Sequence, residues 1–402
     1  MSSSSSEVAI IGSGLSGLAL ALSLHHNKIP CTVYESRPAP LNIGGAIMLS
    51  PNALRILNTL GVYERIRSQG YNFDLLEFKD TSGKLLEVQE FGGEQKYGFR
   101  GLRIYRHIVI DVLVAMLKER EIPVHYGKKY SHVVSEGEQV VWEFTDGTRA
   151  EAALLVGADG IHSSVRKYIY PDIEPVFTGM AGIAAAVPSS QLRLPAGELP
   201  TPVTILSPKG AFILAPQQHD ASEVLIAKQF RSEAKDREGW KTFANDEEAT
   251  VKFLQSNNDL FPEIVHNAVS KIDYKTINVW PFYVVPQLAK WHSDGCRVVI
   301  LGDAAHAIPP SAGQGVNQAF EDVYALGLLL GGMHTRGKEM GEALVSWEGY
   351  RQKRVEKVLA LTKQVDLRRV PESRGEQTLE PLEVGWLYNV DIEEDVQGWI
   401  KG

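Results

Sequence analysis

The segment Gly12-Ser13-Gly14-Leu15-Ser16-Gly17 has the G-x-G-x-x-G spacing that allows a backbone turn to hold a pyrophosphate. It follows the apolar run Val8–Ile11, and the next apolar run, Cys31–Glu35, ends on an acid. The first glycine permits the turn, the second lets the backbone approach the phosphates, and the third lets helix and strand pack. Glu35 is placed to accept hydrogen bonds from a ribose. The segment predicts a dinucleotide site for FAD or NAD, against the alternative of a glycine turn without a ligand.

A second segment could face the same ligand. Asp159-Gly160 follows the apolar run 153–156, at the carboxyl end of an expected strand, where open α/β sheets bind ligands. An ordinary strand-ending turn that caps a helix through Ser163 or Ser164 explains the segment equally well.

The segment 301–317 has the most specific pattern. Asp303 stands at the end of an apolar strand, where an acid can hold sugar-like hydroxyls, and prolines stiffen the following loop. Gly313 and Gly315 let the backbone press against a flat ring. The helix that starts near Gly315 points its positive end at that ring and would stabilise a reduced, anionic flavin. For His306 we expect a structural role, in hydrogen bonds to the backbone, rather than a catalytic one.

The elements that position these residues indicate an α/β fold. The chain opens with strand, glycine turn, helix and strand, the order of a Rossmann-type unit. From 175 to 281 the texture changes to short extended runs divided by proline and glycine, which predicts an inserted β-sheet domain. C-terminal helices are expected to complete the fold. The expected parts are an FAD-binding domain of 1–70, 100–175 and 285–370, a substrate-binding sheet domain of 71–99 and 176–284, and a C-terminal arm of 371–402 that packs through Trp386, Tyr388 and Trp399.

In these three ordered motifs the sequence resembles the single-component flavoprotein aromatic hydroxylases, the family of para-hydroxybenzoate and salicylate hydroxylases, over nearly the whole chain. The resemblance implies that Gly45 and Ala46 lie against the flavin, that Arg106 reaches the phosphate side of the cofactor, and that Arg37 helps at the adenosine. The cofactor-binding residues expected on this basis are Gly12, Gly14, Gly17, Glu35, Arg37, Gly45, Ala46, Arg106, Asp159, Asp303, Gly313, Gly315, Val316 and Asn317.

The resemblance also implies a reaction. FAD is the cofactor, and NADPH or NADH binds transiently, without a second Rossmann domain, and reduces it by hydride transfer. Reduced flavin captures O2 as a C4a-hydroperoxide, whose distal oxygen hydroxylates an aromatic or other electron-rich small molecule. Pro310, in the loop that faces the flavin, is the one catalytic candidate. No general base is assigned, because Met48 stands where some relatives place a histidine, which suggests a more apolar substrate.

The substrate wall should come from one face of the inserted sheet, because alternate residues of a strand share a face. Ordinary sheet packing is the commoner role for residues of these types. The candidates are Leu225, Ala227 and Gln229, then Phe212, Leu214 and Pro216, and near a strand end Gln217 and His219.

Composition limits the partners. The 402 residues carry 49 acids and 41 bases, spread evenly, for a net charge of -8, which argues against nucleic acid and anionic membranes. The two cysteines indicate neither a disulfide framework nor a metal site. No apolar run approaches the length of a membrane span, and the serine run at 1–7 lacks the basic start of a signal peptide. We expect a cytoplasmic protein with a small-molecule substrate, and nothing in the sequence indicates an oligomeric state.

Three other protein functions occur with related sequence patterns. A flavin-dependent halogenase is set aside because its Trp-x-Trp-x-Ile motif is missing from the sequence. A flavin-dependent reductase or dehydrogenase without oxygen insertion would carry the same cofactor motifs and stays open. A non-catalytic escort protein of prenylated proteins shares the Rossmann start but lacks the Gly302-Asp303 segment, so this alternative is less favoured.

Overall fold

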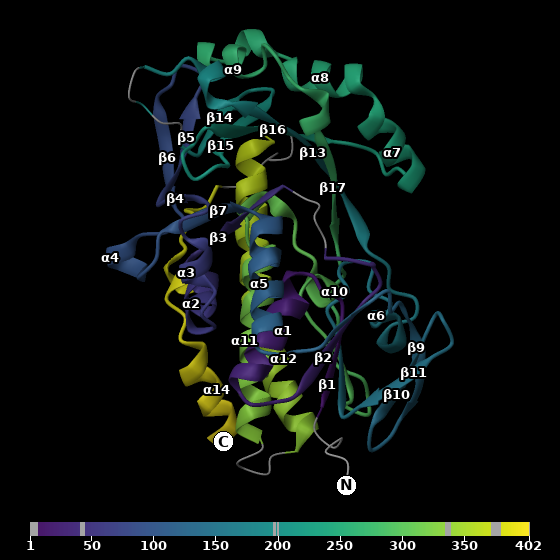
Figure 1. The fold of residues 1–402 in the computed structure, drawn as a ribbon. Helices are drawn as coiled ribbons and strands as arrows, with labels where there is room; N and C mark the ends of the chain where they lie inside the picture. The colour runs from purple at the N-terminus through teal and green to yellow at the C-terminus, as the bar shows by residue number, and fades with distance from the viewer. Residues whose placement is uncertain are drawn as a thin grey trace.

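A five-stranded parallel sheet lies at the base of the molecule in the computed structural model, which describes residues 7–40, 45–195, 198, 201–333, 339–370 and 379–401 (Figure 1). All four residues of its central strand are buried. The strand order is β18 (Val298–Ile300), β12 (Leu154–Gly157), β1 (Val8–Ile11), β2 (Cys31–Glu35) and β8 (Val124–Tyr126). A three-stranded antiparallel sheet flanks it, of β9 (Tyr130–Glu136), β10 (Val140–Phe144) and β11 (Arg149–Ala152).

Three helices cover the parallel sheet on one side. The first of them is apolar along nearly its whole length and contacts both of the others. They are α1 (Leu15–His26), α5 (Arg106–Glu119) and α11 (Gly315–Met333). Shorter helices occupy the connections: α2 (Pro51–Thr59), α3 (Tyr63–Ile66), α4 (Glu94–Tyr97), α6 (Arg166–Ile169), α10 (Asp303–His306) and the 3-10 turn η5 (Pro310–Ala312).

A seven-stranded sheet forms the upper part of the molecule (Figure 1). The two segments that build it are far apart in sequence, and they meet where β14 pairs with β5 in parallel. The order is β17 (Asn278–Val284), β13 (Val176–Pro188), β16 (Glu223–Arg231), β15 (Gly210–Pro216), β14 (Val203–Ser207), β5 (Leu75–Asp80) and β6 (Leu85–Glu90). Its outer face packs a separate apolar core against α8 (Glu247–Gln255) and α9 (Glu263–Ala268).

Between these two sheets lies a small antiparallel sheet of β3 (Ala46–Leu49), β7 (Gly101–Tyr105) and β4 (Tyr71–Phe73). In its register Met48 and Tyr71 both stand opposite Arg103. Directly opposed residues of antiparallel strands point to the same face, so these three side chains share one face of the sheet.

The C-terminal part ties the two main sheets together. The thirty-residue helix α12 (Met340–Arg369) packs along α11 and reaches β14 and β15 at its far end (Figure 1). The chain then returns through α13 (Gly385–Tyr388) and α14 (Ile392–Lys401), and Tyr388 is fully buried there. Residues 371–378 of the expected C-terminal arm lie outside the described residues. Within the described part of the chain, no helix has both the length and the apolarity needed to cross a bilayer.

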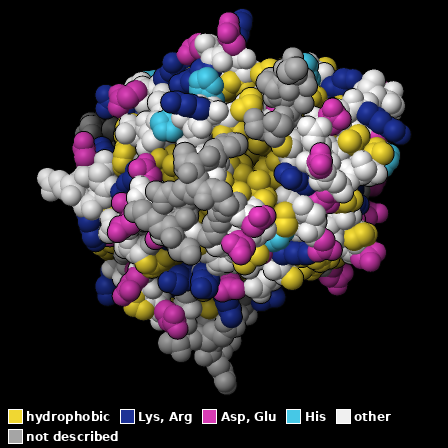
Figure 2. Space-filling view, turned by 90° about the horizontal axis from the view of Figure 1, so that it is seen from below, with side chains coloured by type: hydrophobic (Ala, Val, Ile, Leu, Met, Phe, Trp, Pro, Cys, Tyr) yellow, Lys and Arg dark blue, Asp and Glu magenta, His cyan; other side chains and the backbone are white. Residues whose placement is uncertain are grey.

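The face seen from below agrees with the even charge distribution of the sequence. Among the described residues on this face, Lys and Arg side chains are interspersed with Asp and Glu side chains and with apolar ones (Figure 2). A surface that binds nucleic acid usually carries an extended basic patch, and the described residues of this face form no such patch.

One expectation about secondary structure is wrong. The sequence of 175–281 predicts short extended runs only. The structure places the helices α7 (Arg237–Asn245), α8 and α9 in this segment, and it adds 3-10 turns at Ser189–Leu192, Asn258–Leu260 and Tyr274–Thr276. Asp236 and Asp246 accept hydrogen bonds from the N–H groups of Gly239 and Ala249, at 2.7 and 2.9 Å, and so cap α7 and α8.

Candidate active site

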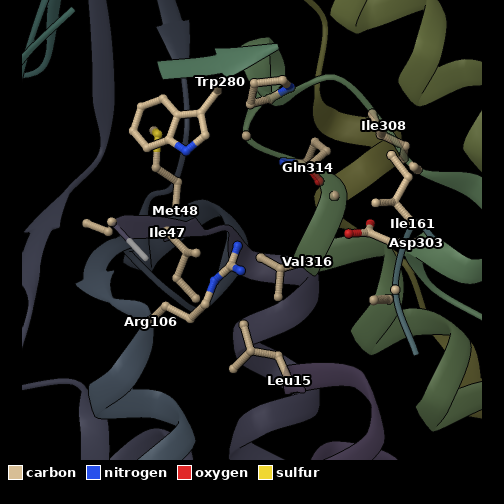
Figure 3. A pocket seen from close by; sticks show the side chains of 18 of the residues that line it. Leu15, Ile47, Met48, Arg106, Ile161, Trp280, Asp303, Ile308, Gln314 and Val316 are labelled. Atoms are coloured by element: carbon tan, nitrogen blue, oxygen red, sulfur yellow. The ribbon is translucent and has the colours of Figure 1, made fainter. Parts of the chain in front are cut away.

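A cavity of about 950 Å³ runs from the carboxyl edge of the parallel sheet to the inner face of the seven-stranded sheet (Figure 3). Most residues predicted as site residues line it, although they come from distant parts of the chain. They are Gly12, Gly14, Glu35, Arg37, Gly45, Ala46, Arg106, Asp159, Asp303, Pro310, Gly313, Gly315 and Val316. Gly17 and Asn317 are not in the wall and act from behind it.

The glycine-rich turn has a different steric constraint at each glycine. Gly12 has a φ of +108°, and a Cβ there would lie 2.5 Å from the Ala158 carbonyl oxygen. A Cβ on Gly17 would lie 1.9 Å from the Gly12 oxygen. At Gly14 nothing stands within 4 Å of a Cβ, and no side chain caps the N-terminus of α1. The open space and the uncapped N–H groups fit a pyrophosphate at this turn.

Glu35 is held against this turn from the end of β2. The N–H and the hydroxyl of Ser13 both donate to Glu35 Oε2 at 2.9 Å, and the Arg37 N–H donates to Oε1 at 2.8 Å. Burial opposes ionisation, but these hydrogen bonds together hold the pKa of Glu35 below its ordinary value. Glu35 is therefore an oriented carboxylate next to the turn, suited to accept hydrogen bonds from ribose hydroxyls.

Asp159 shapes its own loop. Its Oδ1 accepts from the Ser163 hydroxyl at 2.5 Å, and its Oδ2 accepts from the Ser164 N–H at 2.7 Å. The Ser163 hydroxyl accepts in turn from the N–H of Arg166 at 2.8 Å. The turn-capping interpretation thus describes the side chain of Asp159, while Asp159 and Gly160 still form part of the cavity wall.

Asp303 and Arg106 reach into the cavity from opposite sides, with Val316 between them (Figure 3). The Asp303 carboxyl makes no hydrogen bond to any described residue. Desolvation raises the pKa of Asp303, although electrostatic interactions with His306 and Arg106 oppose that rise. An acid and a guanidinium that have no hydrogen-bond partner among the described residues lie on either side of the N-terminus of α11, which fits a ligand that carries both hydroxyls and phosphates.

Asn317 holds the loop 309–313 in place from behind. Its Nδ2 donates to the Met48 carbonyl at 2.9 Å and to the Gly313 carbonyl at 2.6 Å, while its Oδ1 accepts from the Ser50 N–H at 2.9 Å. The side chain is fully buried. It ties β3 to the loop 309–313, which carries Pro310.

Comparisons with known proteins agree with this geometry. The family model described as FAD binding domain matches residues 5–362. The chain is 30% identical over 363 residues to a 3-amino-4-hydroxybenzoate 2-monooxygenase of Streptomyces platensis, covering 87% of this chain and 85% of the relative. It is 27% identical to a salicylate hydroxylase of Pseudomonas putida, covering 97% and 93%. The chain belongs to the FAD-binding monooxygenases.

Solved structures support the same architecture. The monooxygenase matches a substrate complex of salicylate hydroxylase with a TM-score of 0.79 at 23% identity, over 100% of this chain and 99% of the other. It matches the HpxO complex with FAD and uric acid from Klebsiella pneumoniae at 0.77 and 21%, over 98% and 96%. The predicted Rossmann-type fold with a second β-sheet is confirmed, as is the prediction of an FAD-dependent monooxygenase of the aromatic hydroxylase type.

The side of the monooxygenase cavity that the seven-stranded sheet forms is mostly apolar. Leu225, Ala227 and Gln229 line it, as candidates on β16 should. The expectation for β15 is confirmed only for Leu214, which belongs to the cavity wall. Phe212 packs in the outer core, where its ring centroid lies 5.9 Å from that of Phe261, and the alternate residues Ile213 and Ala215 also line the cavity. The register of β15 beside β16 decides which face turns inward.

His306 of the monooxygenase has the structural role that was expected, but with a different partner. Its Nε2 lies 2.5 Å from Asp322 Oδ2, and its ring packs on Trp291 with the two ring centroids 4.9 Å apart. Asp322 Oδ2 also accepts from the Gly302 N–H at 2.9 Å. The pair therefore holds the turn that presents Asp303, through a carboxylate rather than through the backbone.

Sequence reasoning overlooked two arginines of the monooxygenase. Arg166 donates to the Ala304 carbonyl at 2.9 Å and to the Ile161 carbonyl at 2.8 Å, and so joins the Asp159 turn to the Asp303 turn. The sequence could have indicated Arg166, because this residue ends the segment that begins with Asp159. Arg103 lies in the cavity wall on β7, and its signal was a single cation within an otherwise apolar strand.

We expect Asp303→Asn to weaken FAD binding about 10- to 100-fold while leaving the fold intact. A hydrogen bond to a charged acceptor contributes about 1.5–3 kcal/mol, and Asp303 bonds to no other described side chain. Titration of apoprotein with FAD, followed by flavin fluorescence, measures the Kd. Asp322→Asn is the comparison and should lower the Tm as well as the FAD affinity, because Asp322 anchors His306 and the Gly302 turn that presents Asp303. An unchanged Kd in Asp303→Asn would mean that this carboxylate does not contact the cofactor.

Proposed function

We propose that this monooxygenase uses NADH or NADPH and O2 to hydroxylate an electron-rich aromatic small molecule held between the loop 309–313 and the seven-stranded sheet. The observation that carries the proposal is one continuous cavity that joins the dinucleotide turn to an apolar wall. Two relatives support an aromatic substrate, since they are named for 3-amino-4-hydroxybenzoate and salicylate. The sequence has one dinucleotide fingerprint, which supports transient binding of the nicotinamide cofactor.

The proposed roles divide along the cavity. Gly12, Gly14, Gly17, Glu35 and Arg37 hold the adenosine and pyrophosphate part of FAD. The middle and flavin parts are held by Gly45, Ala46, Arg106, Asp159, Asp303, Gly313, Gly315, Val316 and Asn317. Bound FAD supplies hydride acceptance and oxygen activation. The chain's own residues orient the ring and exclude water from it, and Pro310 lies on the face where the substrate would meet the flavin.

The same proposal includes the domain limits and the compartment. We assign 1–70, 100–175 and 285–370 to cofactor binding, 71–99 and 176–284 to the substrate, and 371–402 to the C-terminal arm. The seven-stranded sheet takes strands from both of the proposed substrate segments, which supports this division. A cytoplasmic location, where reduced nicotinamide cofactors are available, suits the proposed reaction.

The test is an absorbance spectrum of the purified protein, then NADPH or NADH oxidation and oxygen uptake with phenols, benzoates and hydroxypyridines. We expect bound flavin, and oxygen uptake that rises at least about 10-fold with a substrate and yields hydroxylated product. Nicotinamide oxidation in which a substrate is reduced or desaturated without oxygen insertion would instead support a reductase or dehydrogenase. Colourless protein that does not take up FAD would contradict the proposal altogether.

A further inference from the structure

The inner face of the seven-stranded sheet forms a wide, largely apolar floor of the cavity. The strand register places four residues in one row across β14, β15, β16 and β13, namely Thr204, Ile213, Ala227 and Ala184. Directly opposed residues of antiparallel strands point to the same face, and all four line the cavity. Because neighbouring strands lie about 4.8 Å apart, this row is about 14 Å long.

A second row lies further from the loop 309–313. Ala215 stands opposite Leu225, and both line the cavity. Gln229 Nε2 donates to the Ser311 hydroxyl at 3.1 Å, which fixes the loop beside the other end of β16. Leu225 precedes Gln229 by four residues, or about 13 Å of extended strand. The two rows together are the apolar floor, and a single aromatic ring, roughly 7 Å across with its van der Waals surface, covers about half of the floor in either direction.

The two faces of these strands differ in side-chain size and in packing. On the outer face the alternate positions carry Phe212, Val224 and Ile226, which are fully buried in the outer core. On the inner face Leu225 and Ala227 are only half-buried, because they border the cavity. Three residues of the apolar floor have no carbon beyond Cβ, namely Ala184, Ala215 and Ala227. Protein interiors are close-packed, so short side chains beside an open cavity leave room for an apolar ligand.

Protein closes the apolar floor at the end that lies away from the loop 309–313. Gln217 and Glu223 stand two residues beyond Ala215 and Leu225, and the Gln217 N–H donates to the Glu223 carbonyl at 2.8 Å. From β7, the Tyr105 hydroxyl donates to the Glu223 carboxylate and accepts from Gln217 Nε2 at 3.0 Å. These contacts join β7 to the ends of β15 and β16. A ligand on the apolar floor therefore has a limited length.

We propose that the substrate carries an apolar substituent several carbon atoms long, which lies on the apolar floor while the ring that is hydroxylated lies beside the loop 309–313. Binding is stabilised in proportion to the apolar area removed from water, and both rows offer such area. Thr204 is the only residue of the apolar floor with a polar side chain. A polar substituent would therefore lose its hydrogen bonds to water there without replacement. This inference rests on the proposed function, which it makes more specific.

The test measures how affinity depends on chain length in the oxidised, FAD-loaded enzyme. The probes are 3-alkylphenols and 4-alkylphenols, from methyl to octyl, and the Kd is measured from the change in the flavin absorbance. In at least one series we expect the Kd to fall about three- to fourfold for each added methylene, as burial of one CH2 predicts, and then to level off at the closed end. In Ala215→Phe the added ring fills the second row. Phenols with butyl or longer chains should then bind at least about 10-fold more weakly than to the wild type, and methylphenols within about twofold of it.

Ala186→Phe is the matched control, because Ala186 stands opposite Leu225 on β13 but does not line the cavity. It should keep the wild-type dependence on chain length. Flavin content and Tm show whether each variant is folded, and Ala215→Leu, which adds less volume, replaces Ala215→Phe if the latter is unstable. A Kd that does not fall with chain length in either series, or that falls equally in the wild type and the Ala215 variant, would overturn the inference. Because binding is measured without turnover, that result is distinct from a failure of oxygen insertion, which would instead overturn the proposed function.

Discussion

The Gly14→Val variant should lose FAD affinity by about 100-fold or more, or roughly 2.7 kcal/mol, without losing its fold. Gly14 has a φ of -74° and a ψ of -175°, which valine adopts without strain, and nothing lies within 4 Å of a Cβ there. The free space is on the cavity side, where the second glycine of the fingerprint lets the backbone approach the pyrophosphate. The added side chain would occupy the place of the phosphates.

Gly17→Val is the matched comparison. A Cβ at Gly17 would lie 1.9 Å from the Gly12 oxygen, so this variant should lower both the Tm of the apoprotein and the FAD affinity. Isothermal titration with FAD and thermal unfolding of apoprotein separate the two effects. Tight FAD binding by Gly14→Val would show that the pyrophosphate does not lie at this turn.

The Arg351→Met variant should lose about 3 kcal/mol of the free energy of unfolding, because it removes the buried cation that Glu321 and Asp322 share and leaves Glu321 with Arg354 alone. Arg351 Nε donates to Asp322 Oδ1 at 2.7 Å, and its Nη1 donates to Glu321 Oε2. All three side chains are fully buried. Urea unfolding of the apoprotein measures the loss. Arg65→Met removes an exposed ion pair with Glu119 and should cost less than about 1 kcal/mol.

The pH dependence of the same variant gives an independent check. Burial opposes ionisation of Glu321, but Arg351 and Arg354 hold its pKa at about 2, against an ordinary 4.5. A carboxylate whose pKa is lower in the folded than in the unfolded protein contributes its full stabilisation above the unfolded-state pKa. This contribution decreases as the pH falls toward the folded-state pKa. The difference in stability between wild type and Arg351→Met should therefore be large at pH 7 and narrow between pH 4.5 and 2. A difference that stays constant over this range would mean that Arg351 acts through packing alone.

Much of the cofactor half of the site could be predicted because its constraints are local. A G-x-G-x-x-G spacing specifies a turn and a helix start within six residues, and no distant contact is needed to define it. Asp303 and Gly313 likewise lie within one strand–loop–helix segment, 301–317. The sequence predicted two central strands with the same bounds as in the structure. β1 is an apolar run that ends before a glycine, and β2 is an apolar run that ends on an acid.

The substrate half was poorly predicted because its residues meet only through the tertiary fold. The sequence cannot tell which face of β15 turns inward, since both faces are apolar, and its neighbours decide that Ile213 and not Phe212 lines the cavity. The helices of 237–268 were missed although they carry local signals, since Asp236 and Asp246 stand at the N-caps of α7 and α8.

By itself, the sequence determined the family, the cofactor and the place of the dinucleotide turn, because short motifs carry their own geometry. Only the tertiary structure decided that Arg103 would be buried without a counter-charge. Arg103 and Gln217 are 114 residues apart and meet where β7 faces the end of β15. Whether a cation is solvated or stripped of water depends on everything packed around it, and no local pattern contains that information.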